Sequence, residues 1–169
     1  MLPRFFIALT FFLFVYPLRG YADPVRDCAS DVADTAIAGC TASIATGKYK
    51  GRDLALLYST RGDSYKKKNQ IDRALADFDQ AVKNDPQNKN LLFDRGEAFY
   101  IKKDFESAIA DFSAAIKLFP IYVKAYVYRG DSYRNMKNNQ QALADFNEAL
   151  RLNDNNVVAL KYRRSTHLA

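Results

Sequence analysis

RALADFDQAVKNDP, at residues 73–86, is the stretch that decides the fold, because the chain repeats it twice more. The phrase returns as SAIADFSAAIKLFP at residues 107–120 and as QALADFNEALRLND at residues 141–154. Each copy begins 34 residues after the one before it. A fixed period of this length predicts a stack of identical supersecondary units, since one unit alone cannot bury its apolar face.

Each repeat also has an upstream half, which reads YSTRGDSY, LFDRGEAF or YVYRGDSY and begins at residue 58, 92 or 126. Small residues on two consecutive helices let the backbones approach closely, while aromatic residues fill the space beside them. The recurring small and aromatic positions are Gly62, Gly96 and Gly130; Tyr65, Phe99 and Tyr133; Ala74, Ala108 and Ala142; Phe78, Phe112 and Phe146; and Ala81, Ala115 and Ala149.

The apolar spacing is helical on both sides of a short polar break such as residues 68–70, so each repeat is predicted to be a helical hairpin. Pro86 and Pro120 are expected to end second helices. We predict an all-α fold, an α-solenoid of three hairpins within residues 54–169, with a short N-terminal helix and a C-terminal capping helix. The repeats are predicted at about 55–88, 89–122 and 123–156, with first helices near 54–67, 89–102 and 123–136, second helices near 71–84, 105–118 and 139–152, and the capping helix at 157–168.

At these positions the sequence resembles the tetratricopeptide repeat (TPR) family over about residues 54–154, because small, aromatic and proline positions recur together. It departs from the family pattern at two places. Tyr58, Leu92 and Tyr126 stand where the family often has Trp, and Asp154 replaces a third proline. The resemblance implies a module for protein–protein interaction, with a protein or peptide segment bound on the concave side that the first helices line.

Residues 1–22 have the pattern of an export signal. Arg4 supplies the positive start, an apolar run follows at residues 5–15, and small residues precede the expected cleavage site at Ala22. This pattern predicts a periplasmic or secreted protein that begins at Asp23. The run is shorter than the roughly 20 apolar residues that span a membrane. An uncleaved membrane anchor is the alternative, and contact with a membrane is expected only in that case.

Residues 23–53 lie outside the repeats and are predicted to cover the first hairpin, as terminal caps of solenoids do. We expect an irregular lead and then a helix near residues 35–46, with Asp34 or Thr35 capping its start and Gly47 its end. Cys28 and Cys40, the only cysteines, are separated by eleven residues. In an exported chain such a pair is most simply a structural disulfide, with free thiols as the alternative. An export signal, two cysteines and then repeats together resemble small exported TPR proteins of Gram-negative bacteria, which implies a periplasmic address.

The sequence offers little for catalysis or for a cofactor. His167 is the only histidine, there is no Cys-x-x-Cys pair and no glycine-rich phosphate loop. We therefore predict no enzyme activity, no metal and no cofactor. The formal charge of +6 is a mild excess without a dense basic stripe, so no nucleic-acid partner is expected. The repeated arginines are predicted to pair with repeated aspartates, as Arg61 with Asp77, Arg95 with Asp111 and Arg129 with Asp145.

From the helical phase of their residues, we predict that the outward face of the first helices forms a protein-binding groove. Three of its aromatic residues are expected to face out of the core and to anchor a ligand. Its carboxylates are expected to form an acidic row that suits a ligand with at least one basic residue. The predicted groove residues are Asp63, Lys66, Phe93, Glu97, Tyr100, Lys124, Tyr128, Asp131 and Arg134. The alternative is that Phe93 and Tyr128 pack against neighbouring first helices and the row is only solvated.

The resemblance also implies a test of one binding mode, in which TPR domains grip a C-terminal carboxylate with lysines, asparagines and an arginine. The matching positions hold Ser59, Asp63, Asp94, Lys124 and Tyr128, and only Lys124 has the right chemistry. That clamp is therefore predicted to be absent. Two hypotheses remain: a periplasmic adaptor or scaffold with a peptide in its groove, or a structural protein that associates with itself or a membrane assembly through the end helix.

Overall fold

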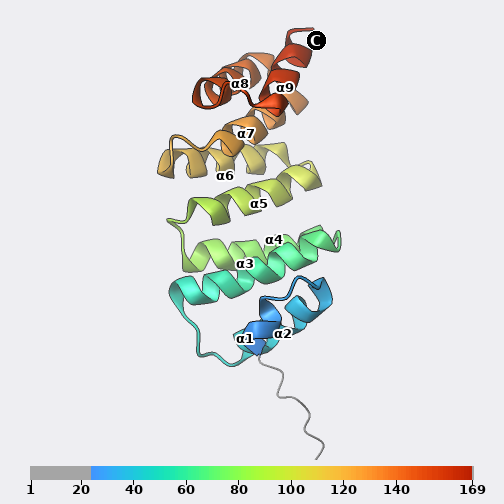
Figure 1. Cartoon of the computed structure of the whole chain (residues 1–169), viewed down its shortest axis with the longest axis vertical. Coiled ribbons are helices and arrows are strands. Elements are labelled where there is room, and N and C mark those ends of the chain that lie inside the picture. The colour runs from blue at the N-terminus through green and yellow to red at the C-terminus, as the bar shows by residue number, and fades with distance from the viewer. Residues whose placement is uncertain (1–23, 169) are drawn as a thin grey trace, which may run out of the picture.

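The computed structural model describes residues 24–168, and these residues form a stack of helices without strands (Figure 1). Residues 1–22, where we predict the export signal, lie outside this part. No helix within residues 24–168 is long and apolar enough to cross a membrane. The helices are α1 (Pro24–Cys28), α2 (Ala33–Ala45), α3 (Gly51–Lys67), α4 (Ile71–Asn84), α5 (Lys89–Lys102), α6 (Phe105–Leu118), α7 (Val123–Asn135), α8 (Asn139–Leu152) and α9 (Val157–His167).

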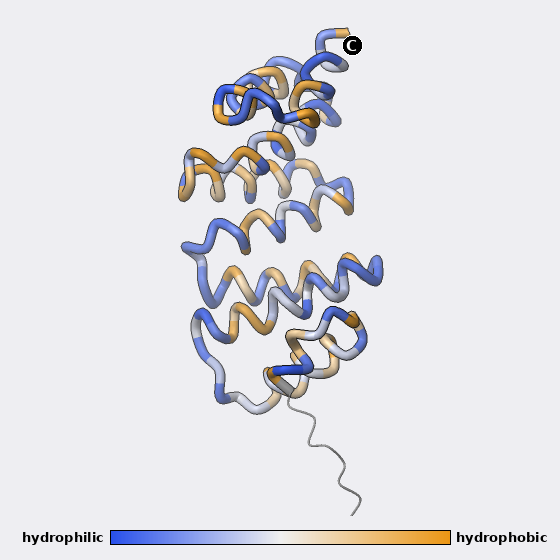
Figure 2. Tube along the Cα trace, in the orientation of Figure 1, coloured by the Kyte–Doolittle hydropathy of each residue, from blue (hydrophilic) through white to orange (hydrophobic). Residues whose placement is uncertain are grey.

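The predicted α-solenoid is confirmed. Each first helix packs on its own second helix and on the second helix before it, so α3–α4, α5–α6 and α7–α8 form successive hairpins and α9 follows α8 (Figure 1). Apolar and polar residues alternate along each helix, as expected for helices with one buried face (Figure 2). Helices α4, α5, α6 and α8 have the predicted bounds, whereas α3 begins three residues earlier than predicted.

A glycine–phenylalanine contact holds each hairpin together. The rings of Phe78, Phe112 and Phe146 are fully buried. A Cβ atom added to the paired glycine would lie 2.9 Å from the Cε1 atom of Phe78, 2.8 Å from that of Phe112 and 2.7 Å from that of Phe146. Because real Cβ contacts are longer than this, the glycine lets the two helices approach closely enough to bury the ring.

A left-handed residue closes the first helix of each hairpin, although none of the three is glycine. The φ angle is +57° at Asn69, +66° at Lys103 and +63° at Lys137. The next backbone N–H then donates to a carbonyl five residues earlier, as Asp104 does to Phe99 at 3.0 Å. This is the usual way to satisfy the free carbonyls at a helix end.

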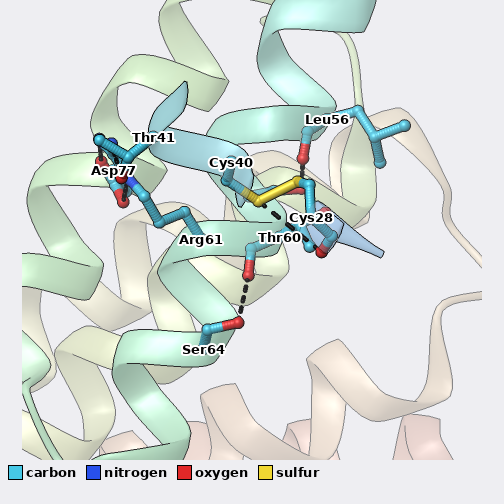
Figure 3. The surroundings of a disulfide bond; sticks show 9 residues. Cys28, Cys40, Thr41, Leu56, Thr60, Arg61, Ser64 and Asp77 are labelled. Atoms are coloured by element: carbon cyan, nitrogen blue, oxygen red, sulfur yellow. Dashed lines mark hydrogen bonds and ion pairs between the residues drawn. A yellow bond between two sulfur atoms is a disulfide. The ribbon is translucent and has the colours of Figure 1, made fainter. Parts of the chain in front are cut away.

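The N-terminal cap differs in part from the prediction. The lead is not irregular, since residues 24–28 form α1, and α2 begins at Ala33 with no side-chain cap from Asp34 or Thr35. Gly47, with a φ of +66°, follows the end of α2 near its predicted place. The predicted disulfide is confirmed, because Cys28 and Cys40 are joined (Figure 3). Both cysteines are buried against Leu57 of α3.

Candidate functional site

The first helices α3, α5, α7 and α9 lie side by side along the stack, each in contact with the next. A pocket of about 480 Å³ opens between α5, α7 and α9. Six predicted groove residues line it, which are Phe93, Glu97, Tyr100, Lys124, Tyr128 and Asp131, together with Val127, Asn156, Val158 and Tyr162. The predicted residues Asp63, Lys66 and Arg134 do not line it.

Three lining residues come from the α9 end of the pocket and were missed by sequence reasoning. The sequence predicts Val158 and Tyr162 in the capping helix at 157–168 and Asn156 at the end of the third repeat. The repeat period could have identified two of these residues, because Tyr162 lies 34 residues after Tyr128 and Val158 lies 34 residues after Lys124. Helix α9 repeats the first-helix pattern, so it presents a pocket-facing side as α5 and α7 do.

Phe93 does not face out of the core, so that part of the prediction is wrong. Its side chain is only 7% exposed, and its ring packs at centroid distances of 5.4 Å from Phe112, 5.2 Å from Tyr122 and 5.4 Å from Tyr128. Tyr128 of the neighbouring first helix α7 and Tyr122, which caps the start of that helix, cover it. Phe93 therefore forms the floor of the pocket.

Tyr100 and Tyr128 keep part of their surface in the pocket. Both side chains are half-buried, and their rings meet edge to face at 5.5 Å. Such pairs stabilise packing by about 0.5–1.5 kcal/mol beyond the area that they bury. The two residues are therefore packed side chains with one accessible edge. This arrangement is intermediate between rings that face out of the core and rings that pack fully against neighbouring helices.

Glu97 is already engaged by two neighbours. Its carboxylate accepts a hydrogen bond from the Nζ atom of Lys66 in α3 at 2.5 Å and another from the hydroxyl of Tyr128 in α7 at 3.1 Å. Burial opposes the charge on Lys66, but the carboxylates of Glu97 and Asp63 outweigh it and raise the pKa of Lys66. Glu97 thus ties three successive first helices together.

Asp131 is engaged in the same way, and it is only 3% exposed. Its carboxylate accepts hydrogen bonds from the Tyr100 hydroxyl and from Nε of Arg134 at 2.8 Å. Burial raises the pKa of Tyr100, and the Asp131 carboxylate raises it further, so the phenol keeps its proton. The Arg134 guanidinium lies over the ring of Tyr162, 5.1 Å from its centroid. Glu97 and Asp131 are therefore links between repeats and not the free acidic row that we predicted.

Asp94 lies among charged groups on the same side. Burial raises the pKa of its carboxyl to about 7, and the charges of Asp63 and Glu97 add to the effect, while Lys66 and Lys124 oppose it. Near neutral pH this side chain is therefore divided between its charged and neutral forms.

Lys124 is the exposed cation of the pocket. The salt bridges found within residues 24–168 do not include it, whereas the two carboxylates that line the pocket both have partners. The charge that this pocket can offer to a ligand is thus positive.

The repeated arginines pair with aspartates as predicted. Two nitrogens of each guanidinium meet both carboxylate oxygens, at 2.8 and 2.7 Å for Arg61–Asp77 (Figure 3), 2.7 and 2.6 Å for Arg95–Asp111, and 2.8 and 2.7 Å for Arg129–Asp145. The remaining nitrogen reaches the unit before it: Arg129 donates to Ser113 of α6 at 3.0 Å, and Arg61 donates to Thr41 of α2 at 2.9 Å. Arg95 and Arg129 therefore join hairpins to one another, and Arg61 joins the first hairpin to the cap.

The part of the chain that the structure describes holds no group of three or more His, Cys, Asp or Glu residues placed to bind a metal ion. The chemistry of the pocket is that of a binding surface, built from rings, one free ammonium group and paired carboxylates.

Two family models, both described as tetratricopeptide repeat, match residues 59–120 and 123–156. The sequence matches no curated protein at a significant level. Two peptide complexes are among the similar solved structures. The first TPR of Spaghetti (RPAP3), bound to the HSP90 peptide SRMEEVD, has a TM-score of 0.68 and 27% identity, over 72% of this chain and 96% of that one. The second TPR domain of human RPAP3, in complex with the HSP70 peptide SGPTIEEVD, has a TM-score of 0.65 and 26% identity, over 67% and 94%.

MamA resembles the chain in fold alone, with a TM-score of 0.77 and 16% identity over 86% of this chain and 78% of that one. TPR domains are typically scaffolds for protein binding without enzyme activity. With the helical hairpins, the glycine–phenylalanine contacts and both family matches in agreement, this chain belongs to the tetratricopeptide repeat family.

Proposed function

We propose that this protein is an exported adaptor that binds a peptide segment of a partner protein in the pocket between α5, α7 and α9. The observation that carries the proposal is the combination of accessible tyrosine edges with the unpaired ammonium group of Lys124 in one pocket. Tyrosine rings and a hydrophobic floor are the usual anchors of a protein interface, because they bury much area at small entropic cost.

The apolar part of the ligand is expected to enter between Tyr128 and Tyr162, over the floor formed by Phe93. Val158 is exposed at the rim and adds apolar surface there. A leucine, valine or aromatic side chain fits a pocket of about 480 Å³ without displacing the core.

The charge of the ligand is expected to be acidic, which revises the basic residue inferred from the sequence. That inference needed free carboxylates, but Glu97 and Asp131 are paired within the protein. A carboxylate of the ligand near Lys124 gains an ion pair, because no salt bridge within residues 24–168 occupies this ammonium group. The peptides in the two RPAP3 complexes both end in Glu-Glu-Val-Asp, which supports this choice of class. A full carboxylate clamp is not proposed, because Lys124 is the only residue of the clamp positions with the right chemistry.

An oxidising compartment is part of the proposal. The export pattern of residues 1–22 and the buried disulfide support it, since disulfides persist in the periplasm and outside the cell. Cell fractionation and intact-mass measurement test it. A protein that is recovered with the cytoplasmic fraction and still carries residues 1–22 contradicts export.

A selection from a peptide library tests the groove. Peptides with an apolar residue next to an acid are expected to be enriched, and their affinity should fall about tenfold for Lys124→Glu and for Val158→Asp. Lys117→Glu, an equal charge change on exposed α6 surface, is the matched control and should bind like the parent. Enrichment of basic peptides, or equal affinity for all three variants, contradicts the proposal.

Tyr128→Ala and Glu97→Lys are poor probes of this pocket. Both side chains link α5 to its neighbours, so their loss destabilises the stack as well as the site.

A further inference from the structure

Helix α9 carries an apolar face that no described residue covers. Val157 is 75% exposed, Leu160 41% and Leu168 82%. Arg164 lies on the same face, one turn after Leu160. Two shallow hollows meet there, and Leu160, Arg164 and Leu168 line both of them. Exposed apolar residues gathered in this way mark interaction surfaces more often than scattered ones do.

The repeat period shows what this face does elsewhere in the chain. Leu92 holds the position of Leu160 in the second repeat, and it is only 7% exposed because its hairpin covers it. The corresponding face of every other first helix packs on its own second helix. The face of α9 is therefore built for packing.

A second helix of the repeat type does not fit against α9. Arg164 stands at the glycine position of the repeat, where even a Cβ atom comes within 3 Å of the phenylalanine ring in the three hairpins. The long side chain of Arg164 keeps any partner further away. The partner must also accept positive charge at that point.

The α9 end of the stack and the α1–α2 turn at its other end have opposite charge. Within residues 155–168, Lys161, Arg163 and Arg164 are the ionic residues and no acid accompanies them. The other end of the stack, formed by α1, α2 and the turn between them, carries Asp27, Asp31 and Asp34 against Arg26 (Figure 1). Asp34 is paired with Lys68 of α3, so the exposed carboxylate that the turn itself offers is Asp31. Val32, in the same turn, is well exposed. Two α9 faces would repel each other, whereas α9 and the N-terminal end attract.

We infer that the α9 face docks on the α1–α2 end of a second copy of this chain, so that copies stack head to tail. The apolar surface of Leu160 and Leu168 meets the turn around Val32, and Arg164 meets Asp31. Such an interface uses two different surfaces and does not close into a dimer, so it produces a series of oligomers. It is independent of the groove, which opens along the side of the stack.

Sedimentation velocity of the protein, as recovered from the cell, tests this inference over about a hundredfold range of concentration. The mean mass should rise with concentration beyond that of a dimer, and about 0.5 M NaCl should reduce it because the salt screens charge pairs. Arg164→Glu and Asp31→Lys should each weaken association about tenfold or more. Both changes in one chain should restore it, because the two ends then exchange charge.

Lys117→Glu is the control for net charge and should associate like the parent. All of these positions are exposed, so the melting temperatures of the variants should equal that of the parent. Leu160→Asp is a second probe of the same face and should also weaken association. A monomer at every concentration, a mass that stops at a dimer, or a double variant that does not recover would each overturn the inference. None of these results bears on peptide binding by Lys124.

Discussion

Gly130 in α7 lies so close to Phe146 in α8 that a Cβ atom on the glycine would be 2.7 Å from the ring. The same contact joins Gly96 to Phe112 and Gly62 to Phe78. The spacing between the two residues is constant in sequence because the helices cross at the same point in every hairpin. Packing therefore requires glycine at each of these positions, although glycine makes a helix interior about 1 kcal/mol less stable than alanine does.

Gly96→Ala is expected to destabilise the protein despite the better helix propensity of alanine. The added methyl group meets Phe112 and the Cβ atom of Asp111, neither of which can move without opening the core. Overpacking of this kind costs about 1–3 kcal/mol. Urea denaturation measures it, with Lys117→Ala on exposed α6 as a control that should change the free energy of unfolding by no more than about 0.5 kcal/mol. Equal stabilities of the two variants would show that the hairpin is looser than described.

Ala108→Leu tests the same packing from the second helix. Ala108 is fully buried in the cluster around Phe112, so the larger side chain is expected to cost about 1–3 kcal/mol or more. A melting temperature equal to that of the parent is the contrary result.

Lys103→Gly should stabilise the protein. Lys103 has a φ of +66°, a conformation that costs a residue with a side chain about 1 kcal/mol more than glycine. The free energy of unfolding is expected to increase by nearly that amount. Ala110→Gly, at an exposed position in the middle of α6, should instead lose about 1 kcal/mol, so the two variants are predicted to shift the melting temperature in opposite directions. Shifts of the same sign would contradict the left-handed turn.

Asp94→Asn should remove a pH dependence of stability. Burial raises the pKa of Asp94 from 3.8 to about 7 in the folded protein, so the folded state holds a proton that the unfolded state releases in this range. Stability from this group is therefore full below about pH 4 and is lost as the pH rises through 7. The amide mimics the neutral form. The variant should gain more stability over the parent at pH 8 than at pH 5.

The control for that measurement is Asp154→Asn, at an exposed position in the turn between α8 and α9. The difference in the free energy of unfolding between this variant and the parent should be the same at pH 5 and at pH 8. A gain of Asp94→Asn that is also constant from pH 5 to pH 8 means that the carboxyl stays charged throughout.

Reduction of Cys28–Cys40 should loosen the cap before the repeats. The disulfide joins α1 to α2, and a loop of this size contributes about 2–4 kcal/mol. Hydrogen exchange in residues 24–45 is expected to accelerate on reduction, while α5–α8 keep their protection. The Cys28→Ser, Cys40→Ser double variant should not respond to reductant. Uptake of two alkylating groups by the unreduced parent would exclude the bond.

Much of the fold follows from the period of the sequence. The bounds of α4, α5, α6 and α8 were predictable because apolar positions and polar breaks recur in each copy, and prolines follow the second helix in the first two. The turns at Lys103 and Lys137 were not, since a left-handed lysine leaves no compositional signal. Gly39 was missed for a related reason. It lets α1 cross α2, where a Cβ atom would lie 2.4 Å from the backbone nitrogen of Cys28, and only the packed structure reveals that crossing.

The groove was predictable only as a face. Helical phase placed Glu97, Tyr128 and Asp131 on the correct side of the first helices. Phase treats each helix alone, however, so it could not show that α7 covers Phe93 or that Tyr100 satisfies Asp131. The Tyr100–Asp131 and Glu97–Tyr128 hydrogen bonds join residues 31 positions apart, so they depend on how successive repeats stack.

Chemical-shift mapping tests the central claim, that a peptide binds between α5, α7 and α9. A selected apolar–acidic peptide is titrated into labelled protein, and the backbone amide signals are followed. We expect the largest shifts at Glu97, Tyr128 and Tyr162, and their loss in Lys124→Glu. Shifts confined to α1–α2 or to the Leu160–Arg164 face, with the pocket residues unchanged, would contradict the account.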